Sequence, residues 1–223
     1  MQYQAEPEGY DRITTFDIET THYNPEKGET VAIGVGVHTP NDPETAASFE
    51  TFLRESRSDE GELVERAFRH IDGLDPDALV SYNGLEFDIK FLSERATHFD
   101  TTLNLPEVHA NGQHIDLFAD RKAASDPDTK WPSLEECLAS YDYPITETVW
   151  NGSPVTNTRF GEELAPAWLE ACMGTDDTAI DTLRDLLDHY LITDLEANLA
   201  IYYADRNIEY RPIFLGRDAS FET

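Results

Sequence analysis

The chain has 223 residues, which is the length of one generous domain or two small ones. Its 39% hydrophobic and 11% aromatic residues suffice for a core and argue against wholesale disorder, and no apolar stretch is long enough to cross a bilayer. The two cysteines, Cys137 and Cys172, do not make a disulfide framework and fit a reducing cytoplasm. Because the first residues are polar and acidic, we expect no secretory signal, no membrane partner and a cytoplasmic location.

The charge is strongly acidic, with 45 Asp and Glu against 16 Lys and Arg and a net charge of −29. The acids are scattered along the chain, so the charge is a property of the whole surface. Such self-repulsion destabilises a compact fold in dilute buffer, whereas molar salt shortens the Debye length to about 3 Å and screens it. We therefore expect a protein from a salt-accumulating halophile, with an acidic nucleic-acid mimic as the alternative. Molar salt also removes most of the counterion release that favours basic nucleic-acid binders, so the charge does not exclude a nucleic-acid partner.

Hydrophobic periodicity and turn residues predict strands first and then alternating helices and strands. The predicted strands are residues 13–19, 30–37, 47–53, 78–82 and 114–118. The predicted helices are residues 59–71, 87–97, 133–141 and 178–206. Ser133 and Glu136 are spaced as a capping box at the start of the third helix, and residues 143–167 are expected to be a loop excursion. This succession predicts one α/β domain over residues 1–223 with a mixed sheet.

The first motif places Asp17 and Glu19 on the first strand. Residues two apart in a strand point the same way, so both carboxylates project from one face. Two carboxylates at a strand end make half of a site for a hard divalent cation. About one residue in five is acidic, however, and Asp194-Leu195-Glu196 repeats the pattern, so this motif alone leaves chance and function both open.

The second motif is Asn83-Gly84-Leu85-Glu86-Phe87-Asp88, directly after a predicted central strand. Asp88 falls in the first turn of the next helix, where the helix dipole favours a carboxylate, so a simple end-of-helix role is one explanation. The connection leaves the carboxyl end of the strand, however, where α/β folds place ligands. Asp88 also shares a helix face with Phe91 and Leu92, which favours a place in a site.

The third motif lies on the last helix, where one stripe faces the core. The stripe consists of Leu183, Leu187, Tyr190, Asp194, Ala197 and Ile201. A buried ionised carboxylate needs a cation or strong donors, and no Lys or Arg lies one turn from Asp194 on this stripe, so a metal is predicted. Tyr190, four residues earlier, can address the same site, whereas His189 lies about 140° away around a regular helix. The alternative is that Tyr190 belongs to an ordinary core and Asp194 to its edge.

In this order the three motifs resemble those of the DEDD exonucleases, of the DEDDy type, in the ribonuclease H-like superfamily. The resemblance covers residues 12–206 and leaves a short tail, residues 207–223. Residues 114–118 and 133–138 are also similar to the proofreading domain of family B DNA polymerases. The resemblance implies an α/β, ribonuclease H-like three-layer fold, with a central mixed five-stranded sheet flanked by helices.

The resemblance also implies an activity, namely metal-dependent 3′-5′ exonuclease hydrolysis that releases nucleoside 5′-monophosphates from DNA or RNA. It implies two divalent cations, Mg²⁺ or Mn²⁺. Asp17 would contact both ions, Glu19 and Asp194 would complete one, and Asp88 would hold the second. Tyr190, which has an ordinary pKa near 10 and is a poor base at neutral pH, would orient the attacking water and the scissile phosphate.

The residues expected to bind the nucleic acid are Thr20, Thr21, Tyr23, Asn83 and Phe87. Where the family often has Gly-Leu after the first motif, this chain has His22-Tyr23, so we expect Tyr23 to stack on the terminal base. Both His189 and Tyr190 match a version of the third motif, and we predict Tyr190 because the helix begins well upstream. Two alternatives stay open, a catalytically silent nucleic-acid-binding module and a structure-selective endonuclease on the same fold. The sequence leaves undecided whether the substrate is DNA or RNA and whether the chain works beside a polymerase or repair complex.

Overall fold

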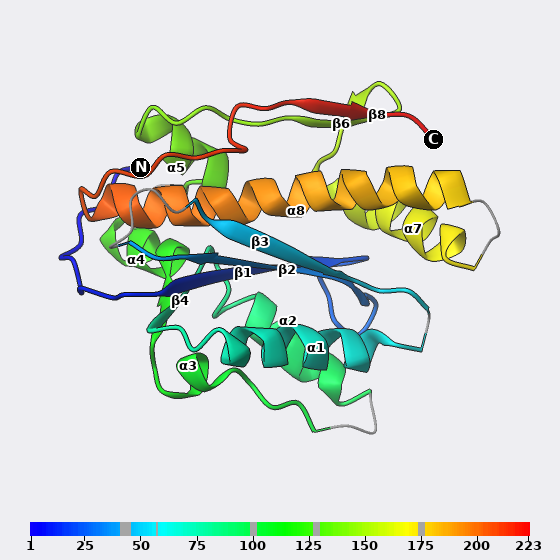
Figure 1. Cartoon of the computed structure of the whole chain (residues 1–223), viewed down its shortest axis with the longest axis horizontal. Coiled ribbons are helices and arrows are strands. Elements are labelled where there is room, and N and C mark those ends of the chain that lie inside the picture. Colours follow the sequence, from blue (N-terminus) through cyan, green and yellow to red (C-terminus); the bar gives the residue numbers. More distant parts are fainter. Residues whose placement is uncertain (41–45, 57, 99–101, 127–129, 174–176) are drawn as a thin grey trace.

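A computed structural model describes residues 1–40, 46–56, 58–98, 102–126, 130–173 and 177–223. Figure 1 shows a central sheet with helices on both faces. Its strands are β1 (Ile13–Thr20), β2 (Thr30–His38), β3 (Ser48–Leu53), β4 (Ala78–Ser81) and β5 (His114–Asp116). The strand order is β3-β2-β1-β4-β5, with β1–β2 and β2–β3 antiparallel and β1–β4 and β4–β5 parallel. The predicted mixed five-stranded sheet is therefore confirmed.

The sheet is buried on both sides, which explains its sequence. All four residues of β4 are buried, as expected for an apolar run at the centre of an α/β sheet. On β1, Phe16 and Ile18 pack into one core cluster, whereas Ile13 belongs to the cluster on the opposite face. This alternation leaves Asp17 and Glu19 on the face that carries the long C-terminal helix.

Different helices cover the two faces of the sheet (Figure 1). One face carries α1 (Glu60–Gly73), α2 (Asp88–Ala96) and the short α3 (Glu107–Ala110). The other carries α4 (Leu117–Ala124) and α8 (Asp177–Asp205), and α5 (Leu134–Ser140) packs against α8 on the side away from the sheet. The capping box at the start of α5 is confirmed, because Ser133 Oγ accepts from the Glu136 backbone while the Glu136 carboxylate accepts from the Ser133 backbone.

None of the described helices is long and apolar enough to span a membrane.

Three of the expectations about local structure were wrong. Residues 143–167 are not a loop, since they contain β6 (Thr148–Trp150), β7 (Ser153–Pro154), α6 (Asn157–Arg159), a π-helical turn η1 (Phe160–Leu164) and the start of α7 (Ala165–Ala171). Residues 207–223 are more than a tail, because β8 (Ala219–Phe221) pairs in parallel with β6 in a second sheet of order β7-β6-β8. The strand predicted at 114–118 ends at Asp116, whose carboxylate accepts from the Phe118 and Ala119 backbones and so caps α4. These elements are only two to eight residues long, too short for a periodic pattern.

Buried ion pairs connect the layers. The Glu60 carboxylate on α1 accepts from Arg95 Nη2 at 2.6 Å and Arg95 Nε at 3.0 Å, and also from the Thr30 backbone N–H at 2.7 Å. Arg121 on α4 donates to Asp205, at the end of α8, over 2.6 and 3.0 Å. Both pairs therefore have the two-bond geometry that makes a buried ion pair tolerable.

Candidate active site

A cleft of about 1040 Å³ opens between the end of β1, the loop after β4, α5, α8 and the segment that contains η1. Every residue that the sequence singled out as a site residue lines it. These residues are Asp17, Glu19, Thr20, Thr21, Tyr23, Asn83, Phe87, Asp88, Tyr190 and Asp194. The structure thus brings together side chains that are up to 177 positions apart in the sequence.

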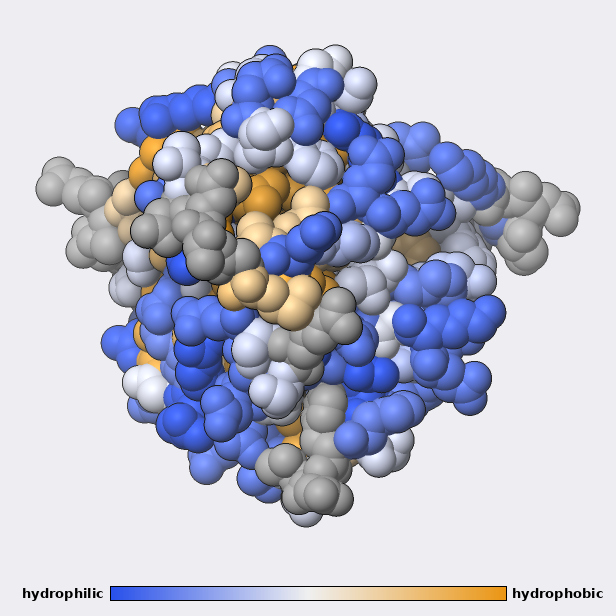
Figure 2. Space-filling view, turned by 90° about the vertical axis from the view of Figure 1, so that its right-hand side faces the viewer, coloured by the Kyte–Doolittle hydropathy of each residue, from blue (hydrophilic) through white to orange (hydrophobic). Residues whose placement is uncertain are grey.

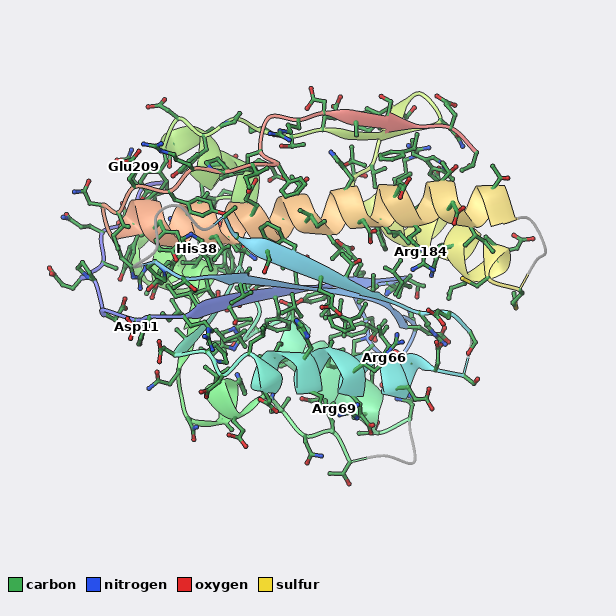
Figure 3. All side chains as sticks on the ribbon, in the orientation of Figure 1. Asp11, His38, Arg66, Arg69, Arg184 and Glu209 are labelled. Atoms are coloured by element: carbon green, nitrogen blue, oxygen red, sulfur yellow. The ribbon has the colours of Figure 1, made fainter. Side chains whose placement is uncertain are left out.

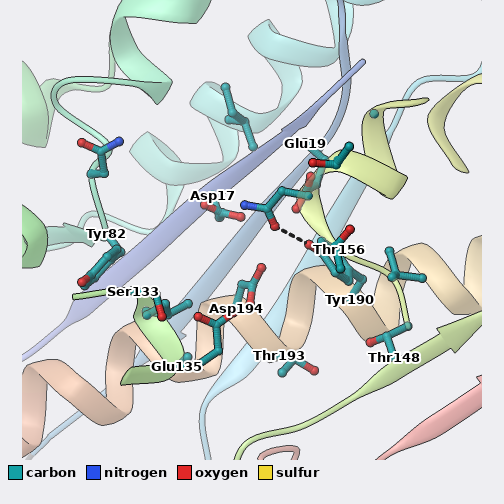
Figure 4. Close-up of a pocket in the computed structure, with 18 of the residues that line it drawn as sticks. Asp17, Glu19, Tyr82, Ser133, Glu135, Thr148, Thr156, Tyr190, Thr193 and Asp194 are labelled. Carbon is teal, nitrogen blue, oxygen red and sulfur yellow. Dashed lines mark hydrogen bonds between the residues drawn. The ribbon is translucent and has the colours of Figure 1, made fainter. Parts of the chain in front are cut away.

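Three carboxylates meet in this cleft. Oxygen atoms of Asp17, Glu19 and Asp194 all lie within 4.8 Å of one another, and Figure 4 shows Asp17 and Asp194 approaching from β1 and α8. The approach depends on Gly34, which pairs with Asp17 on β2, because a Cβ there would lie 2.7 Å from Leu195 Cδ1. A side chain at this position would crowd the side chains of Leu191 and Leu195, through which α8 packs on the sheet.

Asp88 approaches from the loop that follows β4. It is the first residue of α2 and is only 2% exposed. The Asp116 carboxylate shapes this loop by accepting from the backbone N–H groups of Asn83 at 2.9 Å and Leu85 at 3.0 Å. Between them, Gly84 is required by space, since a Cβ would lie 2.2 Å from Ser81 Oγ. Asp116 was not predicted as a site residue. Its position at the end of β5, the strand beside β4, is the feature of the sequence that could have indicated its role.

The electrostatics of the four carboxylates favour a cation. Burial raises the pKa of Asp17 to about 7. Burial first, and then the negative charges of its neighbours, raises the pKa of Glu19, Asp88 and Asp194 well above the usual range. No ion pair with any described residue offsets these charges. A site of clustered, largely half-buried carboxylate oxygens without a basic partner fits hard divalent cations such as Mg²⁺ or Mn²⁺.

Tyr190 lies in the cleft and His189 does not. The Tyr190 hydroxyl donates to Asn157 Oδ1 at 2.9 Å (Figure 4), and its ring stacks on Phe160 at 5.4 Å. Burial and the nearby carboxylates, Glu19 first, raise the Tyr190 pKa well above 10, so the hydroxyl keeps its proton. His189 Nδ1 instead accepts from Thr148 Oγ1 at 2.8 Å, and its Nε2 donates to a backbone carbonyl of the C-terminal segment, also at 2.8 Å.

The mouth of the cleft is formed by the residues after β1. Tyr23 is 77% exposed and stacks on His22 with ring centroids 4.4 Å apart. The Thr20 hydroxyl donates to the His22 carbonyl, and Thr21 Oγ1 accepts from the Glu29 backbone, so both threonines fix the turn. An aromatic ring this exposed is unusual for a structural residue.

Sequence reasoning missed two polar residues of the cleft. Asn157 holds Tyr190, but it lies in the segment that was expected to be a loop. Glu135 points toward Asp194 from α5 in Figure 4, and its negative charge contributes to the raised pKa of Asp194. In so acidic a chain, one more Glu gives no signal in the sequence.

Comparison with known proteins agrees with this geometry. The profile of the RNase_H_2 family, described as RNase_H superfamily, matches residues 14–170. The chain belongs to the RNase H superfamily. This RNase H superfamily chain is 28% identical over 128 residues to a DNA polymerase of Thermococcus aggregans, and 27% identical over 189 residues to a DNA polymerase of Desulfurococcus sp. (strain Tok). The first match covers 48% of this chain and 7% of the polymerase, and the second covers 78% and 23%.

A solved structure shares the fold. The family B DNA polymerase from Pyrobaculum calidifontis superposes with a TM-score of 0.56 at 19% sequence identity, over 85% of this chain and 24% of the polymerase. The RNase H superfamily chain therefore corresponds to less than a quarter of the length of each of these polymerases. At this identity the structural match establishes a common fold.

Proposed function

We propose that this protein is a metal-dependent 3′-5′ exonuclease that hydrolyses DNA or RNA from the 3′ end and releases nucleoside 5′-monophosphates. One observation carries the proposal. Asp88 is buried and Asp17, Glu19 and Asp194 are half-buried in one cleft of an RNase H superfamily fold, and none of the four has an ion pair with a described residue. The similarity to DNA polymerases supports a nucleic-acid substrate.

The four carboxylates would hold two divalent cations, Mg²⁺ or Mn²⁺, with Asp17 shared between them. When bound, such a pair of ions activates water for attack and stabilises the leaving 3′ oxygen. Tyr190 keeps its proton at neutral pH because burial raises its pKa, so it acts as a hydrogen-bond donor to the scissile phosphate or the attacking water and not as a base. In the substrate-free protein this single donor bonds to Asn157 Oδ1, and the substrate would take the place of that bond.

The 3′-terminal nucleotide would be gripped by the residues that line the mouth of the cleft. Tyr23 presents an exposed ring for the terminal base, because every base has a face that stacks on an aromatic side chain. Thr20, Thr21, Asn83 and Phe87 line the same cleft and complete the binding surface.

The assay uses oligonucleotides labelled at the 5′ end, one of DNA and one of RNA, with Mn²⁺ in molar KCl. A 3′-5′ exonuclease shortens them stepwise and leaves the label on a ladder of products. A circular single strand, which has no end, should stay intact. Products from the circle would instead indicate an endonuclease on the same fold, and no products from any substrate would indicate a silent binding module.

A matched pair of variants tests the choice within the third motif. We expect Tyr190→Phe, which removes only the hydroxyl, to lower kcat. His189→Gln should leave kcat nearly unchanged, because His189 does not line the cleft and its ring nitrogens are bonded to Thr148 and to a backbone carbonyl of the C-terminal segment. The reverse result would assign the role to His189.

We also propose that the protein works in the cytoplasm of a salt-accumulating halophile. The support is the net charge of −29 together with two free cysteines. Figure 2 shows that hydrophilic side chains dominate the face seen there. Circular dichroism should detect a folded chain in 2–3 M KCl (about a 2 Å Debye length) and loss of structure in dilute buffer.

A further inference from the structure

One edge of the cleft carries a row of aromatic rings. The Tyr82 and Phe118 rings lie 5.5 Å apart and both line the cleft. Trp131 continues the row, edge-on to Phe118 at 5.8 Å, and is 45% exposed. The other two tryptophans, Trp150 and Trp168, are 7% and 0% exposed. The row therefore leads from the carboxylates to the surface and ends in an exposed indole.

Lysines surround this row. The chain has four lysines, and three of them lie along this edge. Lys122 Nζ is 4.5 Å from the centre of the Trp131 ring, and Lys130 directly precedes Trp131. Lys90 is bonded to Glu86 in the loop before α2, and the positive charge of Lys122 also helps to lower the Glu86 pKa, so the two lysines flank one loop.

These lysines are available to a ligand, whereas most arginines near the core are not. Arg54, Arg95, Arg121 and Arg206 are buried and bonded to acids. Arg66 and Arg69 project from α1, on the face of the sheet away from α8, and Arg184 lies on α8 beside α7 (Figure 3). Lys90 and Lys130 contact only exposed acids, and such surface pairs exchange readily for another anion.

We propose that this edge, consisting of Tyr82, Phe118, Trp131, Lys122 and Lys130, is a platform for the single strand that enters the cleft. The inference rests on the proposed function and adds the path of the substrate. Bases 5′ of the scissile phosphate stack on Phe118 and Trp131, and the backbone phosphates contact the lysines. The terminal nucleotide lies on the other side of the carboxylates, at Tyr23.

The charge of the protein makes such a platform necessary. A chain with a net charge of −29 offers a polyanion no overall electrostatic attraction at any salt concentration, so affinity has to come from local contacts. Stacking on aromatic rings does not depend on counterion release, and it therefore persists in molar salt, where phosphate contacts lose most of their strength. A row of rings with a few lysines is the combination that retains affinity under these conditions.

Kinetics separate this inference from the proposed function. The two substrates are a ten-nucleotide poly(dT) strand and the p-nitrophenyl ester of thymidine 5′-monophosphate, which is too small to reach the platform. We expect Trp131→Ala to raise KM for the ten-mer about 10-fold, a typical loss for one stacked base, and to leave hydrolysis of the ester unchanged. Trp131→Phe, which keeps an aromatic face, should stay close to the wild type.

A charge control is available within the chain. Lys122→Ala should raise KM for the ten-mer, whereas Arg69→Ala, which removes one exposed positive charge on the opposite face of the sheet, should not. Equal effects of the two variants would mean that net charge alone matters and would overturn the platform. If the wild-type protein does not hydrolyse the ester, that result would count against the proposed function and not against the platform.

Binding of the strand can also be measured without its hydrolysis. With Ca²⁺ in place of Mn²⁺, titration with the ten-mer should quench tryptophan emission, and Trp131→Phe should abolish the quenching, because the other tryptophans are buried. Unchanged emission from a protein that still degrades the ten-mer with Mn²⁺ would refute the platform and leave the exonuclease proposal intact.

Discussion

Two groups of buried or half-buried acids in this protein differ in what balances their charge. Glu60 and Asp205 are each bonded to an arginine through two hydrogen bonds. Asp17, Glu19, Asp88 and Asp194 have no such partner among the described residues, and burial raises their pKa values. The first group stabilises the fold, and the second has the unbalanced charge on which the proposed metal site rests.

Glu196 shows that a buried acid in the same helix can be satisfied in a third way. It lies two residues after Asp194, yet its carboxylate accepts from three consecutive backbone N–H groups, those of Ile213, Phe214 and Leu215, at 2.6 to 2.7 Å. Of the two acids in the Asp-x-Glu pattern at 194–196, Asp194 therefore lies in the cleft, whereas Glu196 anchors the C-terminal segment. Only the acids that lack such donors are candidates for metal ligands.

The largest expected effect is on catalysis. Asp17→Asn should reduce nuclease activity by more than about 100-fold, which is the upper range for residues that only support a ligand. Asp185→Asn, an exposed position on α8, is the matched control and should retain full activity. Initial rates on a 5′-labelled strand with Mn²⁺ measure both. Full activity of Asp17→Asn would remove the basis of the proposed mechanism.

The next largest effect is on the free energy of unfolding, which should respond differently to substitutions in the two groups of acids. Asp205→Ala leaves Arg121 buried without its partner and should lower the free energy of unfolding by about 3–5 kcal/mol. Asp194→Ala, measured without metal, removes an unpaired charge and should leave the free energy of unfolding unchanged or raised. Urea unfolding in molar KCl with EDTA compares them. Equal losses would show that Asp194 is as well satisfied as Asp205.

Metal should stabilise the fold in a pH-dependent way. The pKa of Asp17 is raised from 3.8 to about 7, so in metal-free protein its protonation favours the folded state. That contribution is complete below about pH 4 and is lost as the pH rises through about 7. Mn²⁺ competes with the proton, so the gain in the free energy of unfolding over EDTA should grow across this range and approach about 2.7 kcal/mol at 100 times Kd. A gain that is independent of pH would contradict ligation by Asp17.

The smallest effect concerns α5, which carries one wall of the cleft. Ser133→Ala removes the side-chain cap and should cost about 1 kcal/mol in the free energy of unfolding. Ser140→Ala, at the other end of the same helix, removes a hydrogen bond from the Ser140 hydroxyl to the Cys137 carbonyl but no N-terminal cap, and serves as the control. If both variants cost the same, the cap does not determine the stability of this helix.

The sequence predicts the parts of the site that lie on long or strongly patterned elements. Asp17 and Glu19 follow from the two-residue period of β1, and Asp194 from the apolar stripe of α8. The role of Asp88 was predicted from its place in the connection that leaves the carboxyl end of β4. Each of these predictions uses only local periodicity and the rule that strand ends of an α/β sheet meet at one edge.

The rest depends on contacts that periodicity does not encode. The segment with β6, η1 and α7 consists of short elements whose partners are distant, such as β8 and Tyr190. The role of Asn157 follows only from its hydrogen bond to Tyr190, 33 residues away. The position of α8 depends on the missing side chain of Gly34, which sequence alone does not connect to Leu195.

Calorimetric titration of the protein with Mn²⁺ in molar KCl tests most directly whether the unpaired carboxylates bind metal. We predict saturable binding of two ions per chain, its loss in the double variant Asp17→Asn/Asp194→Asn, and its retention in Asp185→Asn. Absence of saturable heat in the folded wild-type protein, or equal binding by the double variant, would contradict the account.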